Sequence, residues 1–194
     1  KAESRGLGDV YKRQALGRPG DHADSDKQFA INCGIKYISP EQMFPFTKKS
    51  SSPELISIPD YREIVLMMGY PGSGKSTLAV KTFKNHPYII IHGDDHKTES
   101  ALKKIFKYTI ETYPNKSIIL DATHSSKKKR QIFIEIAQKA GIPIRLIHLT
   151  TSIEESMHRN LQRDKPVPKI ALYLYRKNFE KPEQSEGLYE IINI

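Results

Sequence analysis

The chain has 194 residues, of which 38% are hydrophobic and 27% are charged, and its formal net charge is +9. This apolar content excludes a disordered chain and can bury the core of one substantial domain together with part of another. No apolar run is long enough to span a membrane and no signal-peptide segment is visible, so we expect a soluble, intracellular protein. The single cysteine, Cys33, cannot form an internal disulfide, and we expect it to be buried.

The first 44 residues fall into two parts. Residues 1–14 contain the run Arg5-Gly-Leu-Gly-Asp-Val-Tyr-Lys-Arg-Gln14, which resembles a translated sequencing adapter, and we interpret them as an artefact outside the fold. Residues 15–44 predict an Asp-rich loop, a short helix, a strand-like segment at 36–38 and a further helix from about Ser39. The three aspartates of the loop can bind Mg²⁺ or cap a helix, and their spacing favours capping. They are Asp21, Asp24 and Asp26.

Residues 45–62 are rich in Pro and Ser and lack periodicity, which is typical of an interdomain linker. An apolar strand is predicted over 63–68. The next residues, Gly69-Tyr-Pro-Gly-Ser-Gly-Lys-Ser76, fit the P-loop pattern without a mismatch, and a helix over 77–83 completes the expected strand–loop–helix context. A chance Gly-rich turn is the alternative, and this context disfavours it.

The chemistry of a P-loop assigns roles to these residues. Three glycines let backbone N–H groups turn toward phosphate oxygens at the positive end of the following helix. Lys75 is expected to reach the β- and γ-phosphates, and the Ser76 hydroxyl is expected to ligate Mg²⁺. ATP and Mg²⁺ are therefore the expected cofactors. The expected nucleotide contacts are Gly69, Tyr70, Pro71, Gly72, Ser73, Gly74, Lys75, Ser76 and Thr77.

Strands and helices are expected to alternate through the rest of the chain. The patterns predict strands at 88–92, 117–120, 144–149 and 189–192, and helices at about 102–113, 127–140 and 152–163. Two prolines, Pro166 and Pro168, then interrupt the chain before the segment 170–179. The fold class predicted for residues 63–194 is α/β, a P-loop NTPase-type parallel sheet with helices on both faces, preceded by the remnant of another domain.

Polar residues that follow the strands are candidates for chemistry, because ligands bind beyond the carboxyl ends of parallel strands. Asp94 or Asp95 can take the proton of an attacking hydroxyl, or the pair can be a solvated loop or a helix cap. Asp121, with Thr123 nearby, can hold Mg²⁺ through a water, contact the acceptor or simply end a turn.

Basic residues give a weaker signal. Residues 64–194 carry 21 Lys and Arg against 13 Asp and Glu, an excess that favours a polyanionic partner. The run 127–130 can contact phosphates or form a solvated helix face. Arg159 and Arg163 lie one helical turn apart, so both can clamp the β- and γ-phosphates; surface salt bridges are the alternative.

The chain resembles the bifunctional polynucleotide 5′-kinase/3′-phosphatases, with the tail of a haloacid-dehalogenase-like phosphatase domain in 15–44 and the kinase domain in 63–194. The resemblance rests on Ala15-Leu-Gly-Arg-Pro19, Asp26-Lys-Gln-Phe-Ala-Ile-Asn32, the P-loop, Asp121-Ala-Thr-His124 and Leu172-Tyr-Leu-Tyr-Arg-Lys-Asn-Phe-Glu180 with Glu186-Gly187. It implies transfer of the ATP γ-phosphate to the 5′-hydroxyl end of DNA or RNA, in nucleic-acid end repair.

The resemblance also implies residue roles. Asp94 matches the general base, Arg163 matches a lid arginine, and the acceptor-side matches are Lys97, Asp121, Thr123 and Arg130. Gly93 departs from the family, which usually has an Arg there, and Arg159 has no clean match. The phosphatase motif Asp-Xaa-Asp-Gly-Thr does not occur in this sequence, so no phosphatase activity is expected of the chain, whereas the parent protein is expected to have one.

Two other functions remain open at this stage. One is a P-loop kinase for a small metabolite, and the other is a non-catalytic nucleotide-binding module. We expect a monomer that binds nucleic acid and no membrane, located in the nucleus if the source is eukaryotic and in the cytoplasm otherwise.

Overall fold

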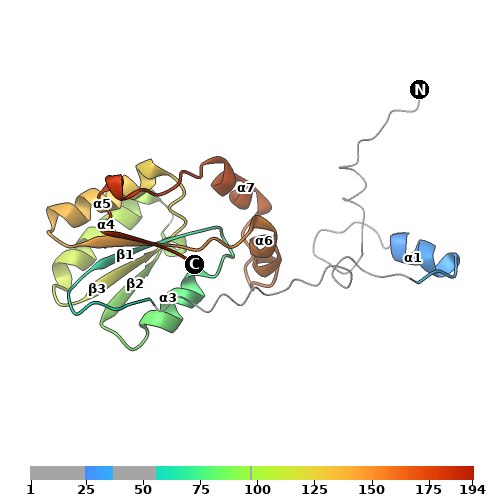
Figure 1. Ribbon diagram of the computed structural model, residues 1–194, viewed down its shortest axis with the longest axis horizontal. Coiled ribbons are helices and arrows are strands. Elements are labelled where there is room, and N and C mark those ends of the chain that lie inside the picture. The colour runs from blue at the N-terminus through green and yellow to red at the C-terminus, as the bar shows by residue number, and fades with distance from the viewer. Residues whose placement is uncertain (1–24, 37–55, 97) are drawn as a thin grey trace, which may run out of the picture. The chain divides into compact units, whose positions relative to one another are not determined.

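The computed structural model describes residues 25–36, 56–96 and 98–194 (Figure 1). The chain divides into two units, residues 1–50 and 51–194. In the first unit the described residues form one helix, α1 (Ser25–Asn32), where a short helix was predicted. Cys33, which follows it, is exposed, so the expectation of a buried thiol was wrong. The side chains of the three loop aspartates and residues 37–44 lie outside the described residues.

The second unit is built on a five-stranded sheet in which every described pair of neighbours is parallel. The order across the sheet is β2-β3-β1-β4-β5, so the strand that leads into the P-loop is central. This confirms the predicted α/β class. The strands are β1 (Ile64–Met68), β2 (Tyr88–His92), β3 (Ser117–Asp121), β4 (Ile144–His148) and β5 (Glu190–Asn193).

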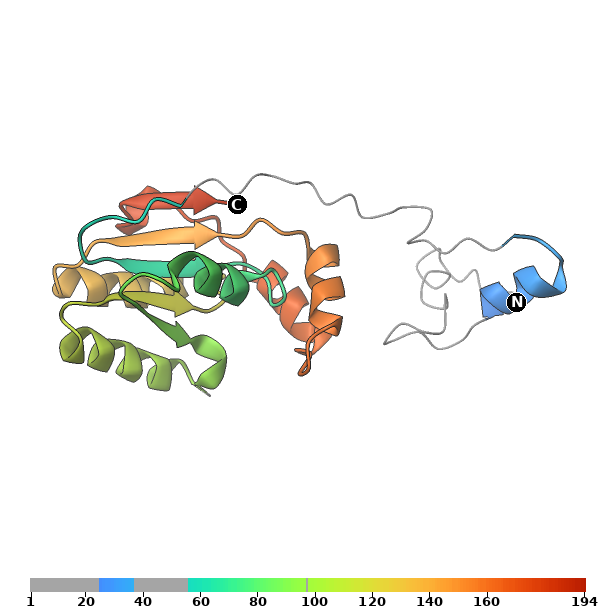
Figure 2. The same ribbon diagram turned by 90° about the horizontal axis from the view of Figure 1, so that it is seen from below.

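Helices cover both faces of this sheet. The α-helices of the unit are α3 (Lys75–Phe83), α4 (Glu99–Thr112), α5 (Lys127–Lys139), α6 (Ile153–Leu161) and α7 (Lys169–Lys177). Two short 3-10 turns, η2 (Gly93–Asp95) and η3 (Gln184–Glu186), complete the described elements. Figure 2 shows α6 and α7, in orange and red, standing beyond the arrowheads of the strands.

The core explains this layering. Side chains alternate along β1, because successive residues of a strand point to opposite faces. Ile64, Leu66 and Met68 join the cluster under α4 and α5, whereas Val65 and Met67 join the cluster under α3. All five are fully buried, as expected for a strand covered on both faces.

Three boundaries differ from the sequence-based expectation. Ile56 and Ile58 pack on the α3 side of the core, so the described end of the predicted linker belongs to the second unit. Helix α6 ends at Leu161, and Arg163 therefore lies in the loop beyond it. Helix α5 ends at Lys139, one residue before the predicted end at 140, and Ala140 is exposed. In the described part of the chain, no helix is both long and apolar enough to cross a membrane.

Candidate active site

The P-loop joins β1 to α3 through backbone conformations that favour glycine. Gly72 and Gly74 have φ angles of 83° and 103°, in the left-handed region. A Cβ added at Gly72 would lie 2.4 Å from the backbone oxygen of Ser156 in α6. The loop therefore packs tightly against α6, and a side chain at position 72 would push the two apart.

Lys75 begins α3 and lies across this loop. Its ammonium group donates hydrogen bonds to the backbone oxygens of Gly69, at 3.0 Å, and Tyr70, at 2.7 Å. Burial lowers the pKa of Lys75 to about 8; the charges of Asp121 and Asp94 oppose this shift and that of Arg163 adds to it. The Lys75 ammonium group is thus poorly solvated and lies in the field of the other charged candidate residues. A poorly solvated cation of this kind is suited to bind an anion.

Ser76 and Thr77 are exposed in the first turn of α3. A serine hydroxyl and a strand-end carboxylate such as Asp121 are the oxygen donors that Mg²⁺ prefers. The described residues contain no group of three or more His, Cys, Asp or Glu side chains able to hold a metal. The oxygen donors of Ser76 and Asp121 are of the type that fits Mg²⁺.

Asp94 and Asp95 lie in η2, directly after β2, and both are exposed. Arg163 Nη2 lies 3.7 Å from Asp94 Oδ2. Asp94 also contributes to the electrostatic environment of Lys75. Asp94 is thus linked both to Arg163 and to the electrostatics of the P-loop lysine.

Gly93, where the related kinases usually have Arg, sits against the end of β3. A Cβ added at Gly93 would lie 2.8 Å from the Cβ of Ala122. No larger residue fits there without moving η2. The glycine therefore allows η2 to approach the residue that follows Asp121.

The two arginines of the α6 region reach different targets. Arg159 Nη1 donates to the backbone oxygen of Ser73 at 2.9 Å and pairs with Glu155, whereas Arg163 approaches Asp94. The joint clamp on the phosphates that helical spacing allows stays a prediction. In the next helix, the buried ring of Tyr175 packs against Tyr70 of the P-loop, with ring centroids 4.3 Å apart.

The predicted acceptor-side residues fall in different environments. Asp121 ends β3 and is buried, and its Oδ2 lies 3.0 Å from His92 Nδ1. Thr123 is partly buried, and its backbone oxygen accepts a hydrogen bond of 3.4 Å from Gly69 N–H. Lys97 lies outside the described residues.

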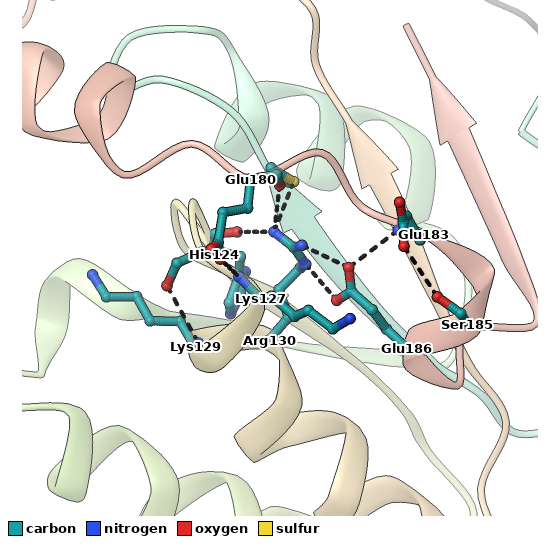
Figure 3. Close-up of polar contacts among 10 residues, drawn as sticks. His124, Lys127, Lys129, Arg130, Glu180, Glu183, Ser185 and Glu186 are labelled. Carbon is teal, nitrogen blue, oxygen red and sulfur yellow. Dashed lines mark hydrogen bonds and ion pairs between the residues drawn. The ribbon is translucent and has the colours of Figure 1, made fainter.

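Arg130 is not the acceptor contact that the sequence suggested. Its side chain is fully buried and forms a two-pronged ion pair with Glu186, with Nε and Nη2 at 2.8 and 2.7 Å from the carboxylate oxygens (Figure 3). Its Nη1 donates to the backbone oxygens of His124 and Glu180. A guanidinium without exposed surface cannot contact a nucleic-acid acceptor. Arg130 instead holds the loop after β3 to the C-terminal segment. Within the basic run 127–130, the three lysines are exposed and Arg130 is not.

Sequence reasoning missed three contributors to this arrangement. His92 is the last residue of β2, where its place before Gly93-Asp94 was an available signal. His124 has a positive φ of 44° and is buried; burial lowers its pKa to about 4, so it is neutral at pH 7. Glu186 is the buried partner of Arg130, and nothing local in the sequence predicted that pairing.

Comparison with known proteins agrees with this architecture. The family model described as an AAA domain matches residues 64–182, and the model described as polynucleotide kinase 3 phosphatase matches residues 2–44. The bifunctional polynucleotide phosphatase/kinase of Schizosaccharomyces pombe is 36% identical over 93% of this chain and 50% of its own length. Residues 64–182 are an AAA domain. The chain as a whole is similar to polynucleotide phosphatase/kinases.

The chain spans about half the length of the curated relatives it matches. The phosphatase match begins at residue 2, so it includes most of the segment set apart as an artefact. A gluconokinase from Sinorhizobium meliloti has a TM-score of 0.52 at 16% identity, covering 69% of this chain and 83% of its own. A fungal RNA kinase also has a TM-score of 0.52, at 19% identity, covering 69% and 38%. At these identities the likeness shows the fold alone.

Proposed function

We propose that the second unit transfers the γ-phosphate of ATP to the 5′-hydroxyl end of DNA or RNA. The observation that carries the proposal is the grouping of a P-loop cation, an exposed carboxylate and a lid arginine at one end of the sheet: Lys75, Asp94 and Arg163. Phosphoryl transfer needs little covalent chemistry from a protein, and catalysis comes from positioning and charge stabilisation. A site with two cations and a carboxylate can supply both the positioning and the charge stabilisation.

Each residue has a place in this reaction. Lys75 and the P-loop N–H groups hold the phosphates, and Ser76 is a ligand of Mg²⁺, which neutralises charge on the β- and γ-phosphates when bound. Asp94 orients the 5′-hydroxyl and takes its proton. Arg163 leaves Asp94 and neutralises charge that develops on the transferred group. Asp121, Thr123 and Lys97 are proposed to face the acceptor.

The nucleic-acid acceptor is supported by the similarity to polynucleotide phosphatase/kinases and by the basic balance of residues 64–194. We propose its action in nucleic-acid end repair, with a 3′-phosphatase activity in the parent protein and none in this chain, because the sequence lacks the Asp-Xaa-Asp-Gly-Thr motif. We also propose a monomer, located in the nucleus of a eukaryotic source or in the cytoplasm otherwise.

Small-molecule kinases share the fold, so the acceptor class is what must be tested. With the full chain, ATP and Mg²⁺, kcat/KM is measured for a 5′-hydroxyl oligonucleotide, a nucleoside 3′-phosphate and gluconate. We expect the oligonucleotide to be preferred over gluconate by at least about 10²-fold, and its KM to rise with salt because the backbone phosphates dominate binding. Equal or better use of gluconate would point to a metabolite kinase. Nucleotide binding without transfer would point to a binding module.

Nucleotide affinity is expected to fall as the pH rises through about 8. Because burial depresses the pKa of Lys75 to about 8, the ammonium form that binds phosphate declines above that pH. The dissociation constant of ATP, measured by calorimetry from pH 7 to 9.5, should therefore increase by up to about tenfold per pH unit at the upper end. Lys84→Ala, just beyond the same helix and exposed, should keep this profile. A constant affinity across the range would contradict the assignment.

A further inference from the structure

The carboxyl ends of β2 and β3 bring a histidine beside the acceptor-side aspartate. The parallel register pairs His92 with Asp121, each the last residue of its strand. His92 Nδ1 lies 3.0 Å from Asp121 Oδ2. A carboxylate oxygen only accepts hydrogen bonds, so Nδ1 carries the hydrogen. The sheet itself therefore sets this contact, because both residues belong to regular strands.

Asp121 also interacts electrostatically with the cation of Lys75. The aspartate side chain is 5% exposed, and its charge is the largest influence that raises the pKa of Lys75 against the effect of burial. A buried carboxylate free to rotate would turn toward that ammonium group, since burial strengthens the attraction between opposite charges. The hydrogen bond from His92 opposes this rotation by holding Oδ2 on the β2 side.

His92 is also close to the surface where an acceptor would enter. Its side chain is 41% exposed, and Asp94 follows two residues later in η2. The ring therefore contacts the buried carboxylate and is also partly open to solvent. Its position suits a residue that acts through Asp121.

We propose that His92 is a positioning residue for the phosphoryl acceptor. It fixes the Asp121 carboxylate so that the other oxygen, Oδ1, is presented to the acceptor in one direction and the carboxylate stays off Lys75. This inference rests on the proposed function, because it assigns Asp121 to the acceptor side of a polynucleotide kinase.

Three substitutions at His92 test this role in the full chain. An Asn amide nitrogen reaches about where Nδ1 stands, a Gln amide nitrogen reaches about where Nε2 stands, and Ala reaches neither. His92→Ala is expected to lower kcat/KM for a 5′-hydroxyl oligonucleotide about tenfold or more, the effect of losing one charge-assisted hydrogen bond. His92→Asn should recover most of the loss and His92→Gln should not. The midpoint of thermal unfolding should stay close to wild type, and any loss of ATP affinity should be much smaller than the loss of kcat/KM.

A double-mutant cycle isolates the pair. If His92 acts through Asp121, His92→Ala should have little further effect in an Asp121→Ala background, so the two losses should not add. Additive losses would overturn the proposal. Equal activity of the Ala variant and wild type would also overturn it, as would a fall in ATP binding and thermal stability that matches the fall in turnover.

A spectroscopic measurement separates this inference from the proposed function. Long-range ¹H–¹⁵N spectra of the ligand-free chain should show neutral His92 protonated at Nδ1, and Asp121→Ala should abolish that preference. Protonation at Nε2 in wild type would overturn the pairing whether or not the chain is active. A wild-type chain that shows the Nδ1 form yet transfers no phosphate to the oligonucleotide would overturn the proposed function, and with it the acceptor-side role.

Discussion

Asp94→Asn is expected to lower the turnover of phosphoryl transfer by about 10²- to 10⁴-fold, the usual contribution of a general base. Asparagine keeps the size of the side chain but cannot take the proton of the attacking hydroxyl. Asp94 is 83% exposed, and the ion pair it loses with Arg163 is long and solvated, so folding should be unaffected. The measurement is initial-rate kinetics at saturating ATP and acceptor, with ATP affinity determined separately.

Asp95→Asn is the matched control for this experiment, because it makes the same change one residue away in the same turn. We expect its turnover to stay within about threefold of wild type, and ATP affinity to change by less than about threefold in both variants. If Asp95→Asn collapses turnover while Asp94→Asn does not, the base has been assigned to the wrong aspartate. If neither variant changes the rate, no carboxylate of η2 acts as the base.

Glu186→Gln is expected to lower the free energy of unfolding by about 3 to 5 kcal/mol, because it leaves the guanidinium of Arg130 buried without its counter-charge. Both side chains of the pair are essentially fully buried, and Arg130 links Glu186 to the loop that carries His124 (Figure 3). Chemical denaturation monitored by circular dichroism measures the loss.

Two further variants define the origin of that loss. Glu183→Gln changes an exposed carboxylate in the same segment and should cost less than about 1 kcal/mol. The double substitution Arg130→Met with Glu186→Leu removes both charges and should cost less than Glu186→Gln alone, because no buried charge is then left unpaired. A Glu186→Gln protein as stable as the Glu183→Gln protein would contradict the importance of this ion pair.

The sequence was sufficient for the parts of the site that depend on local patterns. A P-loop is a contiguous motif, and its Gly72 and Gly74 adopt the backbone conformations for which glycine is needed. The strands of the sheet were predicted within one or two residues because a parallel sheet covered on both faces requires apolar runs. The start of α6 near 152 was predicted as well, and Ser152 caps that helix by accepting a hydrogen bond from Glu155 N–H.

The parts that could not be predicted depend on contacts between distant segments. The pairing of His92 with Asp121 follows from strand register, which no local pattern contains. Arg130 ends a run of three lysines and looked like part of a solvated face, yet its partner Glu186 lies 56 residues away. Arg163 was placed on a helix, and the end of α6 at Leu161 puts it in the loop beyond.

The position of transferred label tests the central claim most directly. The full chain is incubated with ATP labelled at the γ-phosphate, Mg²⁺ and an oligonucleotide that ends in a 5′-hydroxyl, with a 5′-phosphorylated oligonucleotide of the same sequence in parallel. The account predicts label on the 5′ end of the first oligonucleotide and none on the second. Label on neither, from a chain that binds ATP, would contradict a polynucleotide 5′-kinase.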